Sequence, residues 1–204
     1  MAEQTRRGRG RRPAAQVRAE VLAAAGELLL DVGMGAFTFE RVATLSGASK
    51  VTLYKWWPSK GALALEAYFH AVQQHLEFPD TGDIEADLTA QVRSFIGLLA
   101  GRPGAVIREL IGHAQTDPEL LNAFRERYSR PRRDLAIAAM RRAQQRGQIR
   151  ADVDLEVIVD QLWGAGYHRL LLPDEPLTEQ FATALVRNVM TGVGMRHTAA
   201  SREG

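Results

Sequence analysis

The sequence predicts an all-α fold of about nine helices, in which an N-terminal three-helix head precedes a larger helical domain. Two observations indicate this class. Apolar residues recur at spacings of three and four in nearly every segment, whereas strand-like alternation of useful length and internal repeats are absent. The 204 residues are 46% hydrophobic, which suffices to bury a core. We expect a flexible basic arm at 1–12, the head at 13–60, the larger domain at 61–196 and a disordered tail at 197–204.

The head begins with a helix whose apolar residues lie on one face. A stop signal follows at Gly33. The apolar positions of this helix are Val17, Val21, Leu22, Ala25, Leu28 and Leu29.

Two shorter helices come next and are joined by a glycine. Thr38 is the predicted N-cap of a helix that ends at Gly47. Ser49 caps the following helix, which Pro58 terminates. Two short helices connected by a glycine-containing turn form a helix-turn-helix, so the later helix is the candidate recognition helix.

Aromatic and basic residues cluster on this recognition helix. Trp57 follows Leu53 by four positions, which predicts a core residue. Tyr54 and Trp56 lie away from that face and could each place a ring against DNA, although Trp56 as a second core residue is the alternative. Thr52 could reach a phosphate or a base edge. Phosphates would be neutralised by Lys50, Lys55 and Lys60.

Positive charge is concentrated at the N-terminal end. Residues 1–60 hold ten Lys/Arg against five Asp/Glu, a net charge of +5, while residues 61–204 carry −3. Within the arm, we expect Arg9, Arg11 and Arg12 to bind DNA, because an arginine-glycine segment cannot fold alone and is strongly cationic. A solvated terminus without a partner is the alternative.

The larger domain is predicted to contain six further helices. Pro131 lies inside the fourth of them and predicts a kink or break at 128–130. The predicted ranges are 59–77, 83–100, 104–115, 117–146, 154–172 and 177–193.

Two sets of residues in this domain are candidates for binding. The last two helices have more apolar surface than one chain needs, and Gly164 and Gly166 permit another backbone to approach closely, which favours a four-helix dimer interface. Burial of both helices within one chain is the alternative. The candidate interface residues are Leu155, Ile158, Leu162, Phe181, Leu185 and Val189. Helical phase also favours an apolar ligand pocket, although half of its residues could be ordinary core: Phe95, His113, Phe124, Tyr128, Trp163 and Tyr167.

Composition argues against several classes of function. Without cysteine, disulfides and thiolate metal sites are excluded. The five histidines lack metal-ligand spacing, and the common nucleotide-binding and hydrolase motifs are absent, so we expect no metal, no cofactor and no enzyme. An enzyme with a DNA-binding head is the alternative. No apolar run reaches the roughly 18 residues that span a bilayer, and the N-terminus lacks a secretory segment, which predicts a cytoplasmic protein without a membrane partner.

The stretch FTFERVATLSGASKVTLYKWWPSKGAL resembles the DNA-binding region of TetR-family transcriptional regulators, and the match is dense over residues 15–65. Residues 117–172 are similar to the ligand-binding domain of one large TetR subgroup. Val51 and Trp56 depart from the residues common at their positions in the family. The resemblance implies Trp57 as the core aromatic. Together with the arm, the candidate DNA contacts are then Thr38, Ser49, Lys50, Val51, Thr52, Tyr54, Lys55, Trp56 and Lys60.

The resemblance implies a function as well as a fold. We expect a homodimeric repressor that binds double-stranded DNA at a palindromic operator and is released by a small-molecule effector. The alternative is a constitutive architectural DNA-binding protein without an effector.

Overall fold

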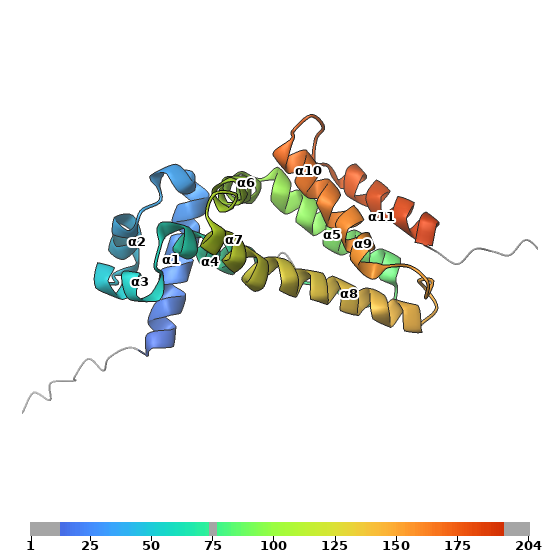
Figure 1. The fold of residues 1–204 in the computed structure, drawn as a ribbon, viewed down its shortest axis with the longest axis horizontal. Helices are drawn as coiled ribbons and strands as arrows, with labels where there is room; N and C mark the ends of the chain where they lie inside the picture. The colour runs from blue at the N-terminus through green and yellow to red at the C-terminus, as the bar shows by residue number, and fades with distance from the viewer. Residues whose placement is uncertain (1–12, 74–76, 194–204) are drawn as a thin grey trace, which may run out of the picture.

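The computed structural model describes residues 13–73 and 77–193. In these two ranges the chain forms nine continuous helical paths and no β-strand, which confirms the predicted all-α class. The DNA-binding candidates Arg9, Arg11 and Arg12, like the tail at 197–204, lie outside the described residues. Figure 1 shows the head, α1 to α3, at one end of an elongated molecule and the larger domain extending away from it.

The head consists of α1 (Ala14–Ala36), α2 (Phe39–Ser46) and α3 (Lys50–Trp56). Both predicted N-caps form, because the side chain of Thr38 accepts a hydrogen bond from the Arg41 amide and that of Ser49 from the Thr52 amide. Gly47 ends α2 in the left-handed conformation at φ 67°, which glycine adopts without strain. The helix is interrupted at its predicted stop, where Gly33 has a non-helical conformation at φ 68° and ψ 179° and forms a kink, and helical residues resume up to Ala36.

The helix α4 (Lys60–Val72) connects the head to the larger domain and packs along α1. A Cβ on Gly26 of α1 would meet both the Ala67 carbonyl oxygen and the Ala71 Cβ of α4 at 3.1 Å. The glycine therefore permits the two helices to approach closely. The next two helices, α5 (Ile84–Ala100) and α6 (Arg102–Ala114), pack against each other, and α6 also contacts α1 and α4.

Pro131 does not break its helix, so a break at 128–130 is wrong, but the regular α-helix is interrupted at 125–129, next to the predicted position. The path continues from α7 (Pro118–Phe124) through a π-helical turn, η2 (Arg125–Ser129), into α8 (Arg130–Gln145). In the wider turn the Arg130 amide bonds to the Arg125 carbonyl, five residues back. The wider turn relieves the contact between the proline ring and the carbonyl four residues earlier, and the helix continues.

The chain closes with two helical segments beside α5. The first comprises α9 (Leu155–Val159), the π-helical turn η3 (Asp160–Gly164) and α10 (Ala165–Leu171), and α11 (Glu179–Val193) follows it. A Cβ on Gly166 would lie 2.7 Å from a Phe95 ring atom, so this glycine lets α10 approach α5 of the same chain. Gly164 instead faces open space.

Candidate DNA interface and ligand cavity

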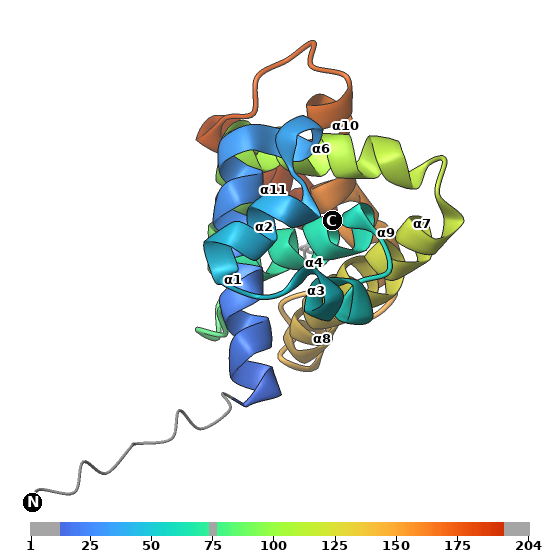
Figure 2. The same cartoon turned by 90° about the vertical axis from the view of Figure 1, so that its left-hand side faces the viewer.

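Figure 2 shows α3 at the end of the molecule that faces the viewer. The outer face of this helix carries both apolar and basic side chains. Val51 is 79% exposed and Tyr54 is 54% exposed, and Lys50 and Lys55 are exposed beside them. If the helix enters a major groove, its exposed apolar side chains can contact thymine methyl groups and deoxyribose. The face has the composition that a recognition helix requires.

Tyr54 is held in position by the neighbouring helix. Its ring packs on Phe39 of α2 with the ring centroids 4.4 Å apart, so the side chain is oriented before any DNA binds. Lys50 forms an exposed ion pair with Glu40 of α2, at 2.8 Å. The Lys50 hydrogen bond lowers the pKa of Glu40. An exposed pair of this kind contributes little stability, which leaves the ammonium able to exchange the carboxylate for a phosphate.

Other predicted contacts have structural roles of their own. The hydroxyl groups of Ser49 and Thr52 lie 2.9 Å apart at the start of α3, where Ser49 is the cap. Lys60 Nζ donates to the Met34 carbonyl at 3.0 Å and so binds the end of α1. Sequence reasoning did not include Arg41, an exposed cation on α2 whose guanidinium donates to the Ala36 carbonyl.

The two tryptophans occupy different environments. Trp57 is 1% exposed, which confirms the prediction of a core residue, and its indole Nε1 donates to Glu66 Oε2 at 2.7 Å. Trp56 is half-buried, packs against the core and meets Trp57 edge-on. Its position is therefore intermediate between the two alternatives, with only part of the ring left for DNA.

Glu66 joins three elements around Trp57. Besides accepting from the indole, its carboxylate pairs with Arg18 of α1 at 2.5 Å and with Arg127 of η2 at 3.5 Å. The Arg18 guanidinium also lies over the Trp57 ring, 5.2 Å from its centroid. The end of the recognition helix is thus connected to the larger domain through one carboxylate.

Five of the six predicted ligand residues line one cavity of about 190 Å³ in the larger domain: Phe95, Phe124, Tyr128, Trp163 and Tyr167. His113 does not, and its placement there is wrong. The buried face of α6 is formed by Val106, Ile107, Leu110 and Ala114, which leaves His113 on the solvent side. The cavity opens beside Leu135, which is 52% exposed.

Several polar residues of the cavity wall were not predicted. Gln91 is 4% exposed, and its Oε1 accepts a hydrogen bond from Trp163 Nε1 at 2.9 Å. Arg132 and Arg133 also line the cavity, and Arg133 is paired with Asp160. A signal for Gln91 was present in the sequence, since it lies in helical phase with the apolar residues of α5.

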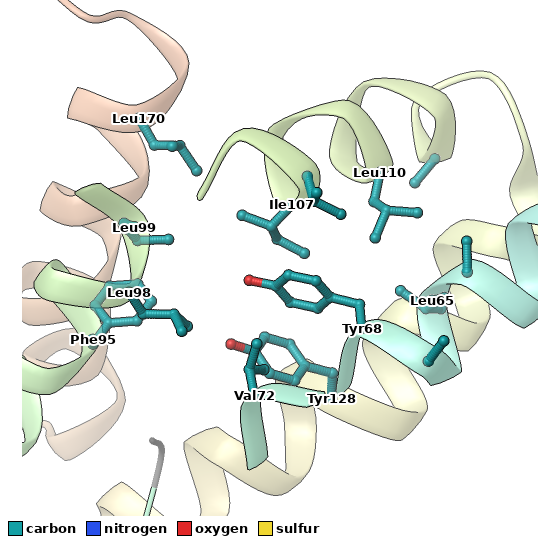
Figure 3. Packing of buried hydrophobic residues seen from close by; sticks show 14 of the residues in the cluster. Leu65, Tyr68, Val72, Phe95, Leu98, Leu99, Ile107, Leu110, Tyr128 and Leu170 are labelled. Carbon is teal, nitrogen blue, oxygen red and sulfur yellow. The ribbon is translucent and has the colours of Figure 1, made fainter. Parts of the chain in front are cut away.

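A tyrosine cluster borders the cavity. A hydrogen bond joins Tyr128 and Tyr167, and burial raises the pKa of both phenols, which keeps them protonated. The hydroxyl of the fully buried Tyr68 has no hydrogen-bond partner among the described residues. Figure 3 shows Tyr68 and Tyr128 side by side, with both hydroxyl groups directed toward Phe95 and Leu98.

A second hollow, of about 500 Å³, lies between the head and the larger domain. Trp56 and Trp57 line it from the head and Glu66 lines it from α4. Tyr128 and Arg132 line both this hollow and the cavity. Phe69 of α4 stacks on Tyr128 with the ring centroids 4.2 Å apart. One wall therefore separates the ligand cavity from the end of the recognition helix.

The structure corrects half of the predicted dimer surface. Leu155, Ile158 and Leu162 are buried in the core of their own chain, with Leu162 at 0% exposure. For these three residues, burial within one chain, which was the alternative to a dimer interface, is therefore correct. Their side chains pack inward because α9 and η3 cover the chain's own core. The candidates on α11 are partly buried, namely Phe181, Leu185 and Val189. Exposed apolar residues occur instead at Val157, Leu171 and Leu172.

Neither a metal site nor a membrane span is found in the part of the chain that the structure describes. Histidine, aspartate and glutamate side chains nowhere gather there in a group of three that could hold a metal ion. Within the same residues, every helix is too short or too polar to cross a bilayer.

A helix-turn-helix head with an exposed basic recognition helix, joined to a helical domain with an internal cavity, defines a DNA-binding transcriptional regulator. The family described as "Bacterial regulatory proteins, tetR family" matches residues 21–67, and "Tetracyclin repressor-like, C-terminal domain" matches residues 78–189. The chain belongs to the TetR family of transcriptional regulators.

Individual relatives agree with this assignment. The chain is 34% identical to the HTH-type transcriptional regulator YdeS of Bacillus subtilis, over 85% of this chain and 87% of that protein. It is 33% identical to the DNA-binding transcriptional repressor TetR of Mycobacteroides abscessus, over 84% and 90% respectively. The crystal structure of the TetR-family regulator SCO0332 superposes with a TM-score of 0.82 at 60% identity, covering 88% of this chain and all of that one.

Proposed function

We propose that this regulator is a homodimeric repressor that binds a palindromic operator through α3 and is released when a small molecule fills the cavity. The exposed face of α3 carries the proposal for DNA. Two such helices would enter successive major grooves about 34 Å apart, the repeat of one turn of B-DNA. One of the similar proteins is a transcriptional repressor, which supports repression rather than activation.

The proposed DNA contacts are Tyr54, Lys50 and Lys55, together with the exposed Val51. Substituting Tyr54 or Lys55 by alanine should weaken operator binding by about 1–3 kcal/mol without unfolding the head. Fluorescence anisotropy with a labelled operator measures this effect, and circular dichroism checks the fold. Glu27→Ala, on the exposed side of α1, is the matched control. Unchanged affinity in both α3 variants would remove the helix from the interface.

Release requires a connection between the cavity and α3, and η2 provides a route. Tyr128 contacts the cavity, and the adjacent Arg127 pairs with Glu66, which in turn holds Trp57 at the end of α3. A ligand that displaces Tyr128 would shift this π-helical turn and change the position of the head. Coupling of about 1–3 kcal/mol would change operator affinity roughly 5- to 150-fold.

A second copy of the chain is expected to bind along the outer side of α9 to α11. Val157 and Leu171 lie on exposed positions of that segment. On α11, Phe181 and Leu185 pack against the chain's own core but remain partly exposed.

Operator affinity measured with and without metabolite extracts tests the function as a whole. A repressor of the proposed kind loses affinity in at least one extract. A constitutive architectural protein keeps the same affinity in all of them and discriminates poorly between operator and random DNA.

A further inference from the structure

The cavity has room for about one aromatic ring and a small substituent. Its volume is about 190 Å³. An apolar protein cavity of about 150 Å³ accommodates benzene, which sets the scale. Long acyl chains and fused polycyclic molecules are too large for this space in the conformation described.

The walls that would contact such a ring are themselves aromatic. Phe95 meets Tyr167 edge-on at 5.4 Å between centroids, Phe124 meets Tyr128 at 5.5 Å, and Phe78 lies 6.3 Å from Trp163. All of these residues line the cavity. Aromatic rings favour edge-to-face and offset contacts with other rings at these separations, so a planar ring is the apolar group that the walls fit.

The polar groups of the cavity are mostly hydrogen-bond donors. The Gln91 side-chain oxygen accepts the hydrogen bond from Trp163, so the amide NH₂ is the group of Gln91 that can bind a ligand. Two arginines line the cavity against one aspartate, and that aspartate is paired with Arg133. Arg132 donates to the Gln73 carbonyl at 3.5 Å, and its guanidinium has five N–H donors in all. A ligand that supplies acceptors and negative charge matches this lining, whereas a cation would face two guanidinium groups.

The tyrosine cluster has more hydroxyl protons than mutual hydrogen bonds. One bond joins Tyr128 and Tyr167, and only one of the two protons is used in it. Tyr68 lies beside Tyr128 but does not line the cavity, and its buried hydroxyl has no partner in the described chain. Arg132 lies against the same cluster, with its guanidinium carbon 5.9 Å from the centroid of the Tyr128 ring. A carboxylate placed here would accept from both kinds of donor.

We propose that the cavity binds a small single-ring aromatic carboxylate, with its ring among Phe95, Phe124 and Trp163 and its carboxylate between Arg132 and the Tyr128–Tyr167 pair. This inference rests on the proposed effector-responsive function and specifies the chemistry of the effector. Since Tyr128 and Arg132 also line the hollow next to the head, the carboxylate would contact the wall through which release is proposed to act.

Isothermal titration of the full chain tests the chemistry with defined probes. The acids are benzoate, the three hydroxybenzoates and phenylacetate. The controls are benzamide, which is neutral, and cyclohexanecarboxylate, which is charged but not aromatic. We expect at least one acid to bind saturably and at least tenfold more tightly than either control, a difference of about 1.4 kcal/mol. Equal affinity for acid and amide, or no binding by any of the acids, would overturn the proposal.

Variants of Arg132 test the placement of the carboxylate. Arg132→Gln should weaken binding of the acid at least tenfold and leave benzamide unaffected, and Arg132→Lys, which keeps the charge, should retain part of the affinity. Arg125→Gln is the matched control, because Arg125 is exposed nearby on η2. If Arg132→Gln binds the acid as wild type does while its melting curve is unchanged, the carboxylate is not at Arg132.

Measurements of operator binding separate the proposed ligand class from the proposed function as an effector-responsive repressor. If metabolite extracts release the operator but none of the acids binds, the regulator stands and the proposed ligand class fails. If an acid binds in the predicted way without changing operator affinity, the ligand class stands and effector release through this cavity fails.

Discussion

Removal of the Glu66 carboxylate should destabilise the protein through Trp57 more than through its two arginine partners. In Glu66→Ala the buried indole N–H loses its acceptor, and an unsatisfied buried donor costs about 1–3 kcal/mol. The ion pairs contribute less, because the side chains of Arg18 and Arg127 are 40% and 62% exposed. Exposed pairs of this kind contribute under about 1 kcal/mol each.

Differential scanning calorimetry measures this loss of stability as a decrease in melting temperature. For a chain of this size, each kcal/mol lowers the midpoint by about 2–4 °C, so the alanine variant should melt roughly 2–12 °C below wild type. Glu66→Gln keeps an oxygen that can accept from Trp57 while removing the charge, and it should recover most of the loss. Glu27→Ala, an exposed position on α1, controls for a change of glutamate in a helix.

Two results would refute this reasoning. If Glu66→Gln were as destabilised as Glu66→Ala, the charge rather than the indole hydrogen bond would hold the site together. If the alanine variant melted like Glu27→Ala, the buried N–H of Trp57 would have found another acceptor, and Glu66 would not join the head to the larger domain.

The remaining predictions concern the head core, the dimer and the arm. Trp57→Ala should cost about 3–5 kcal/mol in urea unfolding, and equal stability would contradict its burial as a source of stability. Val157→Glu should shift the protein toward folded monomers in light scattering, whereas Leu162→Glu should unfold it because that side chain is buried; a monomeric wild type would refute the dimer. Deletion of residues 1–12 should reduce the slope of log affinity against log salt by roughly two to four units without changing the preferred site, and an unchanged slope would make the arm a solvated tail.

Local interactions explain why the sequence was informative about the head. The caps at Thr38 and Ser49 and the left-handed Gly47 depend on residues within three or four positions, so their side-chain types predict the helix ends directly. Trp57 was placed in the core from its spacing to Leu53 alone. The exposed residues of α3 follow from the same helical period, whereas their partners do not, as the contacts of Lys50 with Glu40 and of Lys60 with Met34 show.

Pro131 and the cavity illustrate what local rules leave open. A proline in a helix predicts a break, but the chain can insert a π-helical turn, and the packing around η2 decided between the two. Helical phase brought five aromatic residues to the cavity, yet it misplaced His113, because His113 is exposed near the end of α6 and no residue of α6 lines the cavity. The donors at Gln91 and Arg132 became part of a site only when helices distant in the chain came together.

The sequence by itself determined the helical class, the helix-turn-helix and the residues that its outer face presents. The tertiary structure decided which apolar faces are used within one chain. It buried Leu162, placed Gly166 against Phe95 and placed Gly164 in the wall of the cavity. The physical reason is that periodicity shows that a helix has an apolar face, but the partner of that face depends on contacts between residues many positions apart, which no local spacing encodes.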